Sequence, residues 1–102
     1  MDYKSDIAKY TSGVNEKAVD AIVKFCGIAL KSRDSSIVAV TDAAELDRIR
    51  KGFASKVLNL DEAACDKALK VVSEKMKAEN NKQRVTFYYL LAESAGKLDS
   101  LA

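Results

Sequence analysis

The chain has 102 residues, of which 48% are apolar and 31% are charged, and its formal net charge at pH 7 is +2. This composition is typical of one globular domain with its own core, and it excludes disordered and collagen-like chains. No apolar run approaches the roughly 18 to 20 residues of a membrane-spanning helix, and the N-terminus MDYKSDIAKY is polar where a signal peptide is basic and then apolar. We therefore expect a cytoplasmic protein without a membrane partner.

Helices are favoured throughout, because proline is absent and glycine occurs only at positions 13, 27, 52 and 96. The segment TSGVN separates a short opening helix, at about Ser5 to Tyr10, from a second helix at about Glu16 to Lys31. Asn15 is placed to cap the second helix. The apolar residues of this helix recur at three- and four-residue steps, which predicts one buried face: Val19, Ile22, Val23, Cys26 and Leu30.

Residues 32–41, SRDSSIVAVT, have no clear periodicity. Asp34 or Ser35 is suited to cap a short helix, whereas three β-branched residues favour extended backbone: Ile37, Val38 and Val40. No second strand is predicted to pair with them. We therefore expect either a helical turn or an extended strap that lies on the core.

Two more helices follow, each with an N-cap signal. Asp42 caps the third, with Glu45 three residues on in a capping-box arrangement. Its apolar stripe is narrow: Leu46, Ile49, Phe53 and Val57. Asp61 caps the fourth, whose inward residues are Cys65, Ala68, Leu69, Val72 and Met76. The segment ENNKQ then breaks the fourth helix, with Asn80 and Gln83 spaced as another cap pair.

The fifth helix contains RVTFYYLLAE, residues 84–93, and ends near Gly96. On a helical wheel its apolar side chains form a broad arc: Phe87, Leu98, Leu91, Ala95, Tyr88, Ala92 and Val85. The opposite sector is polar: Lys82, Glu93, Thr86 and Lys97. An arc of about half the circumference suits a helix with neighbours on two sides. We therefore predict an all-α domain over residues 1–102, an irregular bundle of about five helices with this one at its centre.

Tyr89 and Leu90 flank the polar sector of the fifth helix from either side. A neighbouring helix or the strap covers them, or they are ordinary exposed apolar residues, or they form the edge of a partner-binding patch. Arg84 lies within the apolar arc. Its guanidinium either reaches water over a buried stem or binds a carboxylate, which belongs to a ligand or to this chain. The internal candidates are Asp2, Asp6 and Asp34.

Few residues are available for chemistry. Histidine is absent, which excludes a His-based triad, an imidazole general base and a mixed Cys/His zinc site. Cys26 and Cys65 are each central in an apolar stripe, so we expect free, buried thiols rather than a disulfide, a redox pair or a metal site. No phosphate-binding glycine loop, nucleophile elbow or EF-hand spacing occurs. We expect no metal and no cofactor.

Basic residues are frequent in the third helix: Arg48, Arg50, Lys51 and Lys56. They are distributed on both sides of its apolar stripe, whereas a phosphate-binding surface needs them on one face. The fourth helix opens with Asp61, Glu62 and Asp66, which would repel phosphates. We therefore expect a solvated face and no nucleic-acid partner.

Five segments, in this order and spacing, resemble a family of short bacterial proteins: MDYKSDIAKYTS, GIALKSRDSSIVAVTD, EKMKAE, RVTFYYLLAE and GKLD. That family is known only as a domain of unknown function and is largely proteobacterial. The resemblance covers nearly the whole chain, and RDSS and RVTFYYLLAE are its most specific parts. It implies a bacterial cytosolic protein with an all-helical fold, and it implies no activity, ligand or catalytic residue.

Taken together, these features predict a helical module without enzymatic activity that binds another protein or a second copy of itself. The candidate contact residues are Arg84, Tyr88, Tyr89 and Leu90. The alternative is a carrier of a small apolar ligand, with a pocket between helices beside Met76, Phe87 and Tyr88. An enzyme is the third possibility, for which Arg84, the two tyrosines and a carboxylate are the available groups.

Overall fold

A computed structural model of the chain describes residues 3–27, 30, 36–38, 40, 42–79 and 82–101. Within those residues the helices are α1 (Tyr3–Ile7), α2 (Glu16–Cys26), α3 (Ala43–Ile49), η2 (Arg50–Val57), α4 (Glu62–Lys75), α5 (Arg84–Ser94) and α6 (Leu98–Leu101). None of the placed helices is both long enough and apolar enough to cross a membrane. The all-α prediction is confirmed, and α3 with η2 forms the third predicted helix.

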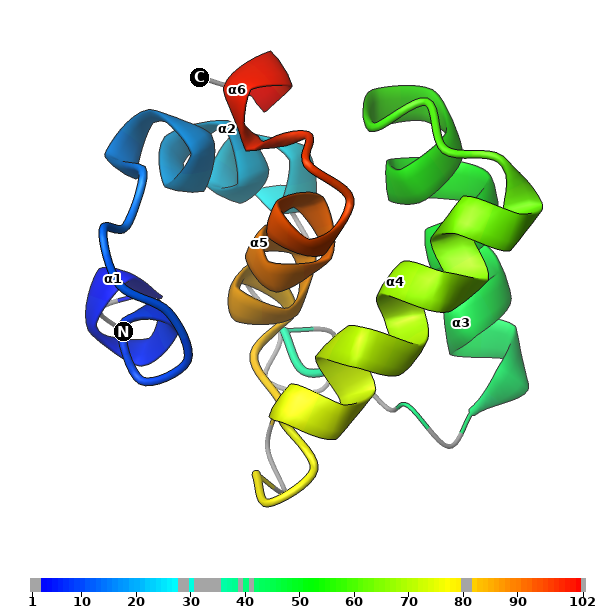
Figure 1. The fold of residues 1–102 in the computed structure, drawn as a ribbon, viewed down its shortest axis with the longest axis horizontal. Helices are drawn as coiled ribbons and strands as arrows, with labels where there is room; N and C mark the ends of the chain where they lie inside the picture. The colour runs from blue at the N-terminus through cyan, green and yellow to red at the C-terminus, as the bar shows by residue number, and fades with distance from the viewer. Residues whose placement is uncertain are drawn as a thin grey trace.

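The aromatic helix α5 lies in the middle of the molecule (Figure 1). It contacts α1 and α2 on one side and α4 on the other, while α6 packs near its C-terminal end and against α2. All nine residues from 84 to 92 are buried. The predicted central position is therefore confirmed, whereas the predicted polar sector is wrong, because Thr86 is 0% exposed and Lys82 is 9% exposed.

The buried polar groups of α5 are paired with groups from other elements. The Thr86 hydroxyl donates a hydrogen bond to the Asp6 carboxylate in α1. The Tyr89 hydroxyl accepts a hydrogen bond of 2.9 Å from the backbone N–H of Asn15, at the start of α2. A polar side chain can be buried at little net cost when its hydrogen bonds are satisfied, which is why α5 tolerates Thr86 in the core.

Three helices begin at the predicted N-caps. The side-chain oxygens of Asn15, Asp42 and Asp61 accept hydrogen bonds from backbone N–H groups in the first turn, at 3.2, 3.0 and 2.8 Å. The cap predicted for α5 is wrong in one respect: Gln83 occupies the N-cap position itself and makes no side-chain cap bond. Its predicted companion, Asn80, lies outside the described residues.

Helix α2 ends at Cys26, five residues before the predicted Lys31. The next residue, Gly27, has a φ of 42°, in the left-handed region that favours glycine and ends a helix. At the other end of the chain, Gly96 has a φ of 70° and terminates α5 as predicted. Leu98 therefore belongs to the separate helix α6, where it is half-buried, and not to the arc of α5.

Residues 36–38 form an extended strap, which confirms one of the two conformations predicted for this segment. The Val38 N–H donates to the Lys82 carbonyl at 2.8 Å, and the Arg84 N–H donates to the Ser36 carbonyl at 2.7 Å. Ile37 and Gln83 thus form an isolated antiparallel bridge, and Val38 is 2% exposed. The caps proposed at Asp34 and Ser35 lie outside the described residues.

The second half of the third predicted helix is a π-helix, η2. The Leu58 N–H donates to the Phe53 carbonyl at 3.0 Å, a bond that spans five residues instead of four. The wider turn moves the buried face one position along the chain. Ile49 and Phe53 are buried as predicted, but Val57 is only half-buried, while Leu58 is 1% exposed. On α4, by contrast, all five predicted inward residues are buried.

Removal of the Thr86 hydroxyl tests the buried hydrogen bond between α5 and α1. A Thr86→Val variant keeps the shape of the side chain but leaves the Asp6 carboxylate without that donor. We expect a loss of about 1–3 kcal/mol in the free energy of unfolding, measured by urea denaturation. Thr11→Val is the matched control, because Thr11 also donates to a carboxylate, Glu93, but at a partly exposed position. We expect it to lose less than about 1 kcal/mol, and equal losses would contradict the argument.

Candidate functional site

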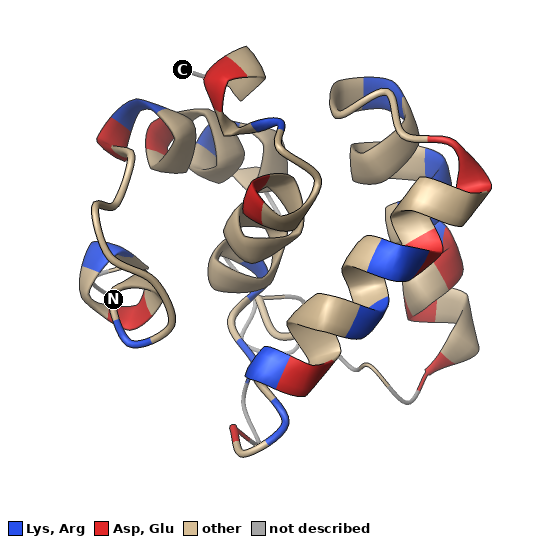
Figure 2. Cartoon of the chain, in the orientation of Figure 1, with Lys and Arg blue, Asp and Glu red and all other residues tan. Residues whose placement is uncertain are grey.

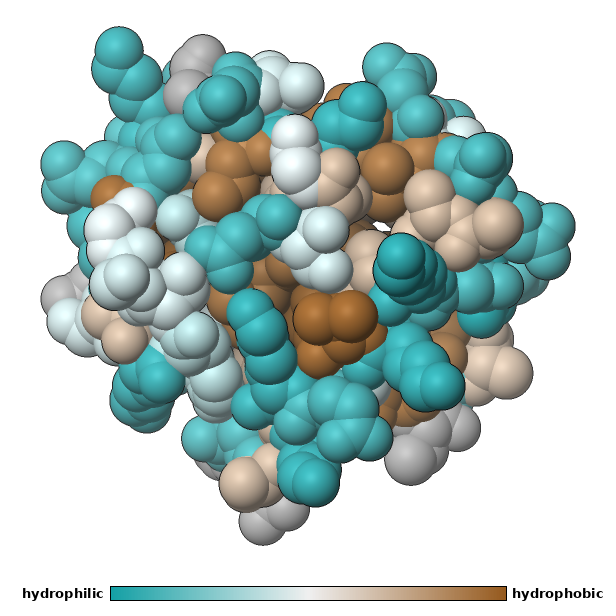
Figure 3. Space-filling model, viewed as in Figure 1, coloured by the Kyte–Doolittle hydropathy of each residue, from teal (hydrophilic) through white to brown (hydrophobic). Residues whose placement is uncertain are grey.

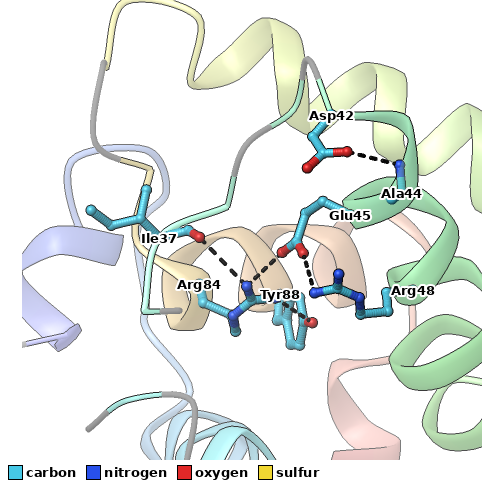
Figure 4. Close-up of polar contacts among 7 residues, drawn as sticks. All are labelled: Ile37, Asp42, Ala44, Glu45, Arg48, Arg84 and Tyr88. Carbon is cyan, nitrogen blue, oxygen red and sulfur yellow. Dashed lines mark hydrogen bonds and ion pairs between the residues drawn. The ribbon is translucent and has the colours of Figure 1, made fainter. Parts of the chain in front are cut away.

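Arg84 lies in the first turn of α5 and is the centre of a buried polar cluster (Figure 4). Its guanidinium forms an ion pair with the Glu45 carboxylate of α3 at 2.5 Å. It also donates to the Tyr88 hydroxyl at 3.0 Å and to the Ile37 carbonyl at 3.4 Å. The side chain of Arg84 is 11% exposed, so the interpretation in which the guanidinium reaches water is wrong.

The carboxylate that Arg84 binds is internal, as one alternative predicted, but it is not one of the three candidates. Asp6 pairs with Thr86 and Lys9 instead, while Asp2 and Asp34 lie outside the described residues. Sequence reasoning missed Glu45 because its position, three residues after Asp42, already had an explanation in the capping box. Three-dimensional packing turns its carboxylate toward α5.

Glu45 joins two arginines of different exposure. Its second oxygen accepts a hydrogen bond from Arg48 at 3.2 Å, one turn further along α3. The side chain of Arg48 is 75% exposed, whereas that of Glu45 is 7% exposed. The carboxylate therefore lies between a buried guanidinium and a solvated one, and its charge is balanced from both sides (Figure 4).

Aromatic rings cover the other side of Arg84. The ring of Tyr88 stacks on Phe53 of η2, with centroids 4.4 Å apart and planes inclined by 19°. Phe25 of α2 packs at a tilt against both rings, at 5.3 and 6.3 Å, and remains 47% exposed. The Arg84 guanidinium carbon lies 5.6 Å from the centroid of Tyr88, within cation–π range. Phe25 is apolar but lies off the predicted face of α2, so its spacing gave no signal for this contact.

The ionisable groups of this cluster keep the charge state that their pairing requires. Burial acts to lower the pKa of Arg84, but Tyr88 and Glu45 outweigh it and raise that pKa above its usual value. Burial raises the pKa of Tyr88 as well. Burial also raises the pKa of the nearby Cys26 thiol to about 11. At neutral pH the cluster thus offers a charged guanidinium, a neutral phenol and a neutral thiol, none of which is an activated nucleophile.

Tyr89 and Leu90 do not join this cluster. Each is 1% exposed. Their burial agrees with the alternative in which neighbouring elements cover them, and it leaves neither side chain available as the edge of a surface patch. The structure therefore brings together Arg84 and Tyr88, and it places the other two candidates elsewhere in the core. Both cysteines are free and buried, as predicted.

The ligand pocket predicted beside Met76, Phe87 and Tyr88 stays a prediction. The first two residues are 0% exposed and Tyr88 is 6% exposed. Two hollows that described residues line lie elsewhere. The hollow along η2 and the start of α4, of about 400 Å³, has mostly charged walls, in which Arg50 pairs with Asp66 at 2.6 Å and with Asp47 at 3.7 Å.

A second hollow has an apolar lining and lies between α4 and the end of α5. We call it the α4–α5 groove, and it has a volume of about 170 Å³. Its walls are Leu60, Ala64, Lys67, Ala68, Val71, Ser94 and Ala95. Val71 is 37% exposed, one of two large apolar side chains that are exposed among the described residues. Figure 3, in the orientation of Figure 1, shows apolar surface on this face in the region of α4 and α5. The sequence signal for it was an apolar residue, Val71, outside the inward stripe of α4.

Replacement of Arg84 tests the buried ion pair. An Arg84→Leu variant leaves the buried Glu45 carboxylate without its main partner, and we expect a loss of about 3–5 kcal/mol in the free energy of unfolding. Arg48→Ala, at the solvated end of the same carboxylate, is expected to lose less than about 1 kcal/mol. Combining Arg84→Leu with Glu45→Leu is expected to recover most of the loss. An Arg84→Leu protein as stable as the parent would contradict this assignment.

The raised pKa of Cys26 predicts a loss of stability in alkali. Because the folded-state pKa of about 11 exceeds the ordinary value of 9.0, the unfolded chain releases this proton first. The thiol therefore contributes its full stabilisation below about pH 9, and this is lost as the pH rises toward 11. Urea denaturation of the parent and of a Cys26→Ser variant checks this. We expect a shallower decline in the variant, which retains Tyr88, and identical declines would refute the contribution of Cys26.

Comparisons with known proteins bear on the chain as a whole rather than on this cluster. A search of curated protein sequences finds no match. A family model matches nearly the full length, including α1 to α5 and the residues that form the Arg84 cluster. The chain belongs to the family described as "Protein of unknown function (DUF2853)", whose model matches residues 2–99.

Proposed function

We propose that this protein is a non-enzymatic module of a bacterial cytosol that binds another protein through the α4–α5 groove. The observation that carries the proposal is the partly exposed Val71 beside an apolar hollow formed by two packed helices. Partner proteins commonly place an apolar side chain into such a groove, and the anchor then contributes most of the binding energy.

The pairing of the buried polar side chains with one another supports a binding role over catalysis. Arg84, Glu45 and Tyr88 are engaged with one another, and the thiol of Cys26 is protonated at neutral pH. A catalytic site instead needs groups that are free to contact a substrate. The Arg84 cluster is better explained as a clamp that joins α3 and the strap to α5.

The size of the groove supports a protein partner over a small ligand. Ligand pockets generally occupy about 300–1,000 Å³ and enclose most of the ligand. The α4–α5 groove, at about 170 Å³, has room for roughly one large apolar side chain. Its shape therefore suits an anchor residue that projects from a larger surface.

Site-specific photocrosslinking tests this proposal. A photoreactive benzoylphenylalanine at Ala64, an exposed residue of the groove wall, is expected to form a discrete adduct in a lysate of the source bacterium. The same probe at Lys17, an exposed position on α2, is the matched control and is expected to form none. Excess unlabelled parent protein should abolish the adduct, whereas a folded Val71→Asp variant should not. Equal adducts at both positions, or competition by Val71→Asp, would refute the groove as the binding surface.

A further inference from the structure

The apolar wall of the groove follows one stripe of α4. Ala64, Ala68 and Val71 recur at four- and three-residue steps, and Leu60 continues the line before the helix begins. The opposite wall, at the end of α5, consists of the small residues Ser94 and Ala95. Small side chains permit close approach of another backbone, and the three- and four-residue steps of the stripe form an apolar edge along which another helix can pack. The shape therefore fits a helical segment.

Two lysines of α4 have no ionic partner among the described residues. Lys67 lines the groove and Lys70 follows it by one turn of α4. Neither lysine forms an ion pair with any residue that the structure places, whereas Lys75 pairs with Glu93 and Lys77 pairs with Glu74. Figure 2 shows basic residues on successive turns of α4. The free lysines favour carboxylates on whatever binds there.

The nearest acidic side chain on the α5 wall does not balance this charge. Glu93 precedes Ser94, and its carboxylate already accepts a hydrogen bond of 2.6 Å from Thr11. Its other oxygen lies 3.6 Å from the ammonium of Lys75. Lys67, which lines the groove, and Lys70, one turn further along α4, therefore have no carboxylate partner among the described residues.

The same charges disfavour a second copy of this chain as the occupant. In a symmetric dimer built on this groove, Lys67 and Lys70 of each copy would face the same surface of the other. Like charges brought together in an interface are repulsive, and this raises the free energy of such a dimer. The occupant is better sought among chains with the opposite charge.

We infer that the segment which packs over the α4–α5 groove, with one apolar side chain inserted into it, is an acidic amphipathic helix of another protein. Its apolar face supplies an aliphatic anchor next to Val71, and its aspartate or glutamate side chains flank that face and meet Lys67 and Lys70. This inference rests on the proposed function, and it adds the chemical class of the partner.

Two synthetic peptides provide the test. Both are fluorescein-labelled helices of equal length with the same leucine face, and the flanking residues are glutamate in one and lysine in the other. Fluorescence anisotropy with the full chain is expected to show at least about tenfold tighter binding of the glutamate peptide. Raising the salt to about 0.5 M is expected to weaken that binding strongly, because the Debye length falls.

Charge-reversed variants locate the binding on the protein. Lys67→Glu combined with Lys70→Glu is expected to lower the affinity for the glutamate peptide by about tenfold or more. The matched control is Lys17→Glu with Lys24→Glu, which makes the same charge change at exposed positions of α2 and is expected to change binding less than about twofold. Val71→Asp is expected to weaken the binding of both peptides. Circular dichroism of each variant verifies that it is folded.

Three results would overturn the inference. These are equal affinities for the two peptides, equal effects of the two charge reversals, and a dimer in light scattering that Val71→Asp dissociates. In each case a crosslink at Ala64 to a different protein would leave the proposed function standing with a partner of another chemistry. Loss of both the crosslink and the peptide discrimination would refute the two proposals together.

Discussion

The burial of α5 from Arg84 to Ala92 constrains the rest of the molecule, because every polar group on that stretch needs a partner inside the fold. Three surrounding elements supply those partners. α1 presents Asp6 to the Thr86 hydroxyl, α3 presents Glu45 to Arg84, and the loop before α2 presents a backbone N–H to the hydroxyl of Tyr89. Apolar packing alone allows neighbouring helices to slide, whereas these directional contacts specify which face of α5 each neighbour meets.

The pairing of these buried groups also limits which residues can contact a ligand or a partner. The residues that look most reactive in the sequence, Arg84 and Tyr88, are engaged with one another and with Glu45 in holding the structure together. The buried ion pair between Arg84 and Glu45 orients α3 against α5, and its two charged groups are already engaged with each other. The surface of α4 differs, because Val71 is partly exposed and Lys67 has no ionic partner among the placed residues. For this reason we propose the α4–α5 groove, rather than the Arg84 cluster, as the binding surface.

Local signals in the sequence predicted much of the fold. The N-caps at Asn15, Asp42 and Asp61 and the inward stripe of α4 depend on contacts within a few residues, and all of them occur. The strap at residues 36–38 and the π-helical turn of η2 were less visible. The strap depends on hydrogen bonds to backbone 44 and 48 residues further on, and η2 depends on an i→i+5 pattern that a 3.6-residue period does not represent.

By itself, the sequence determined the fold class, the positions of the helices and the central place of the aromatic helix, because apolar periodicity and capping act over one or two turns. Only the tertiary structure decided which polar residues are buried and what they bind. Thr86 looked solvated and Glu45 looked like a cap residue until α1 and α5 were in place. Side chains far apart in the chain select their partners through the packing of whole helices, and that packing is not encoded in the neighbourhood of either residue.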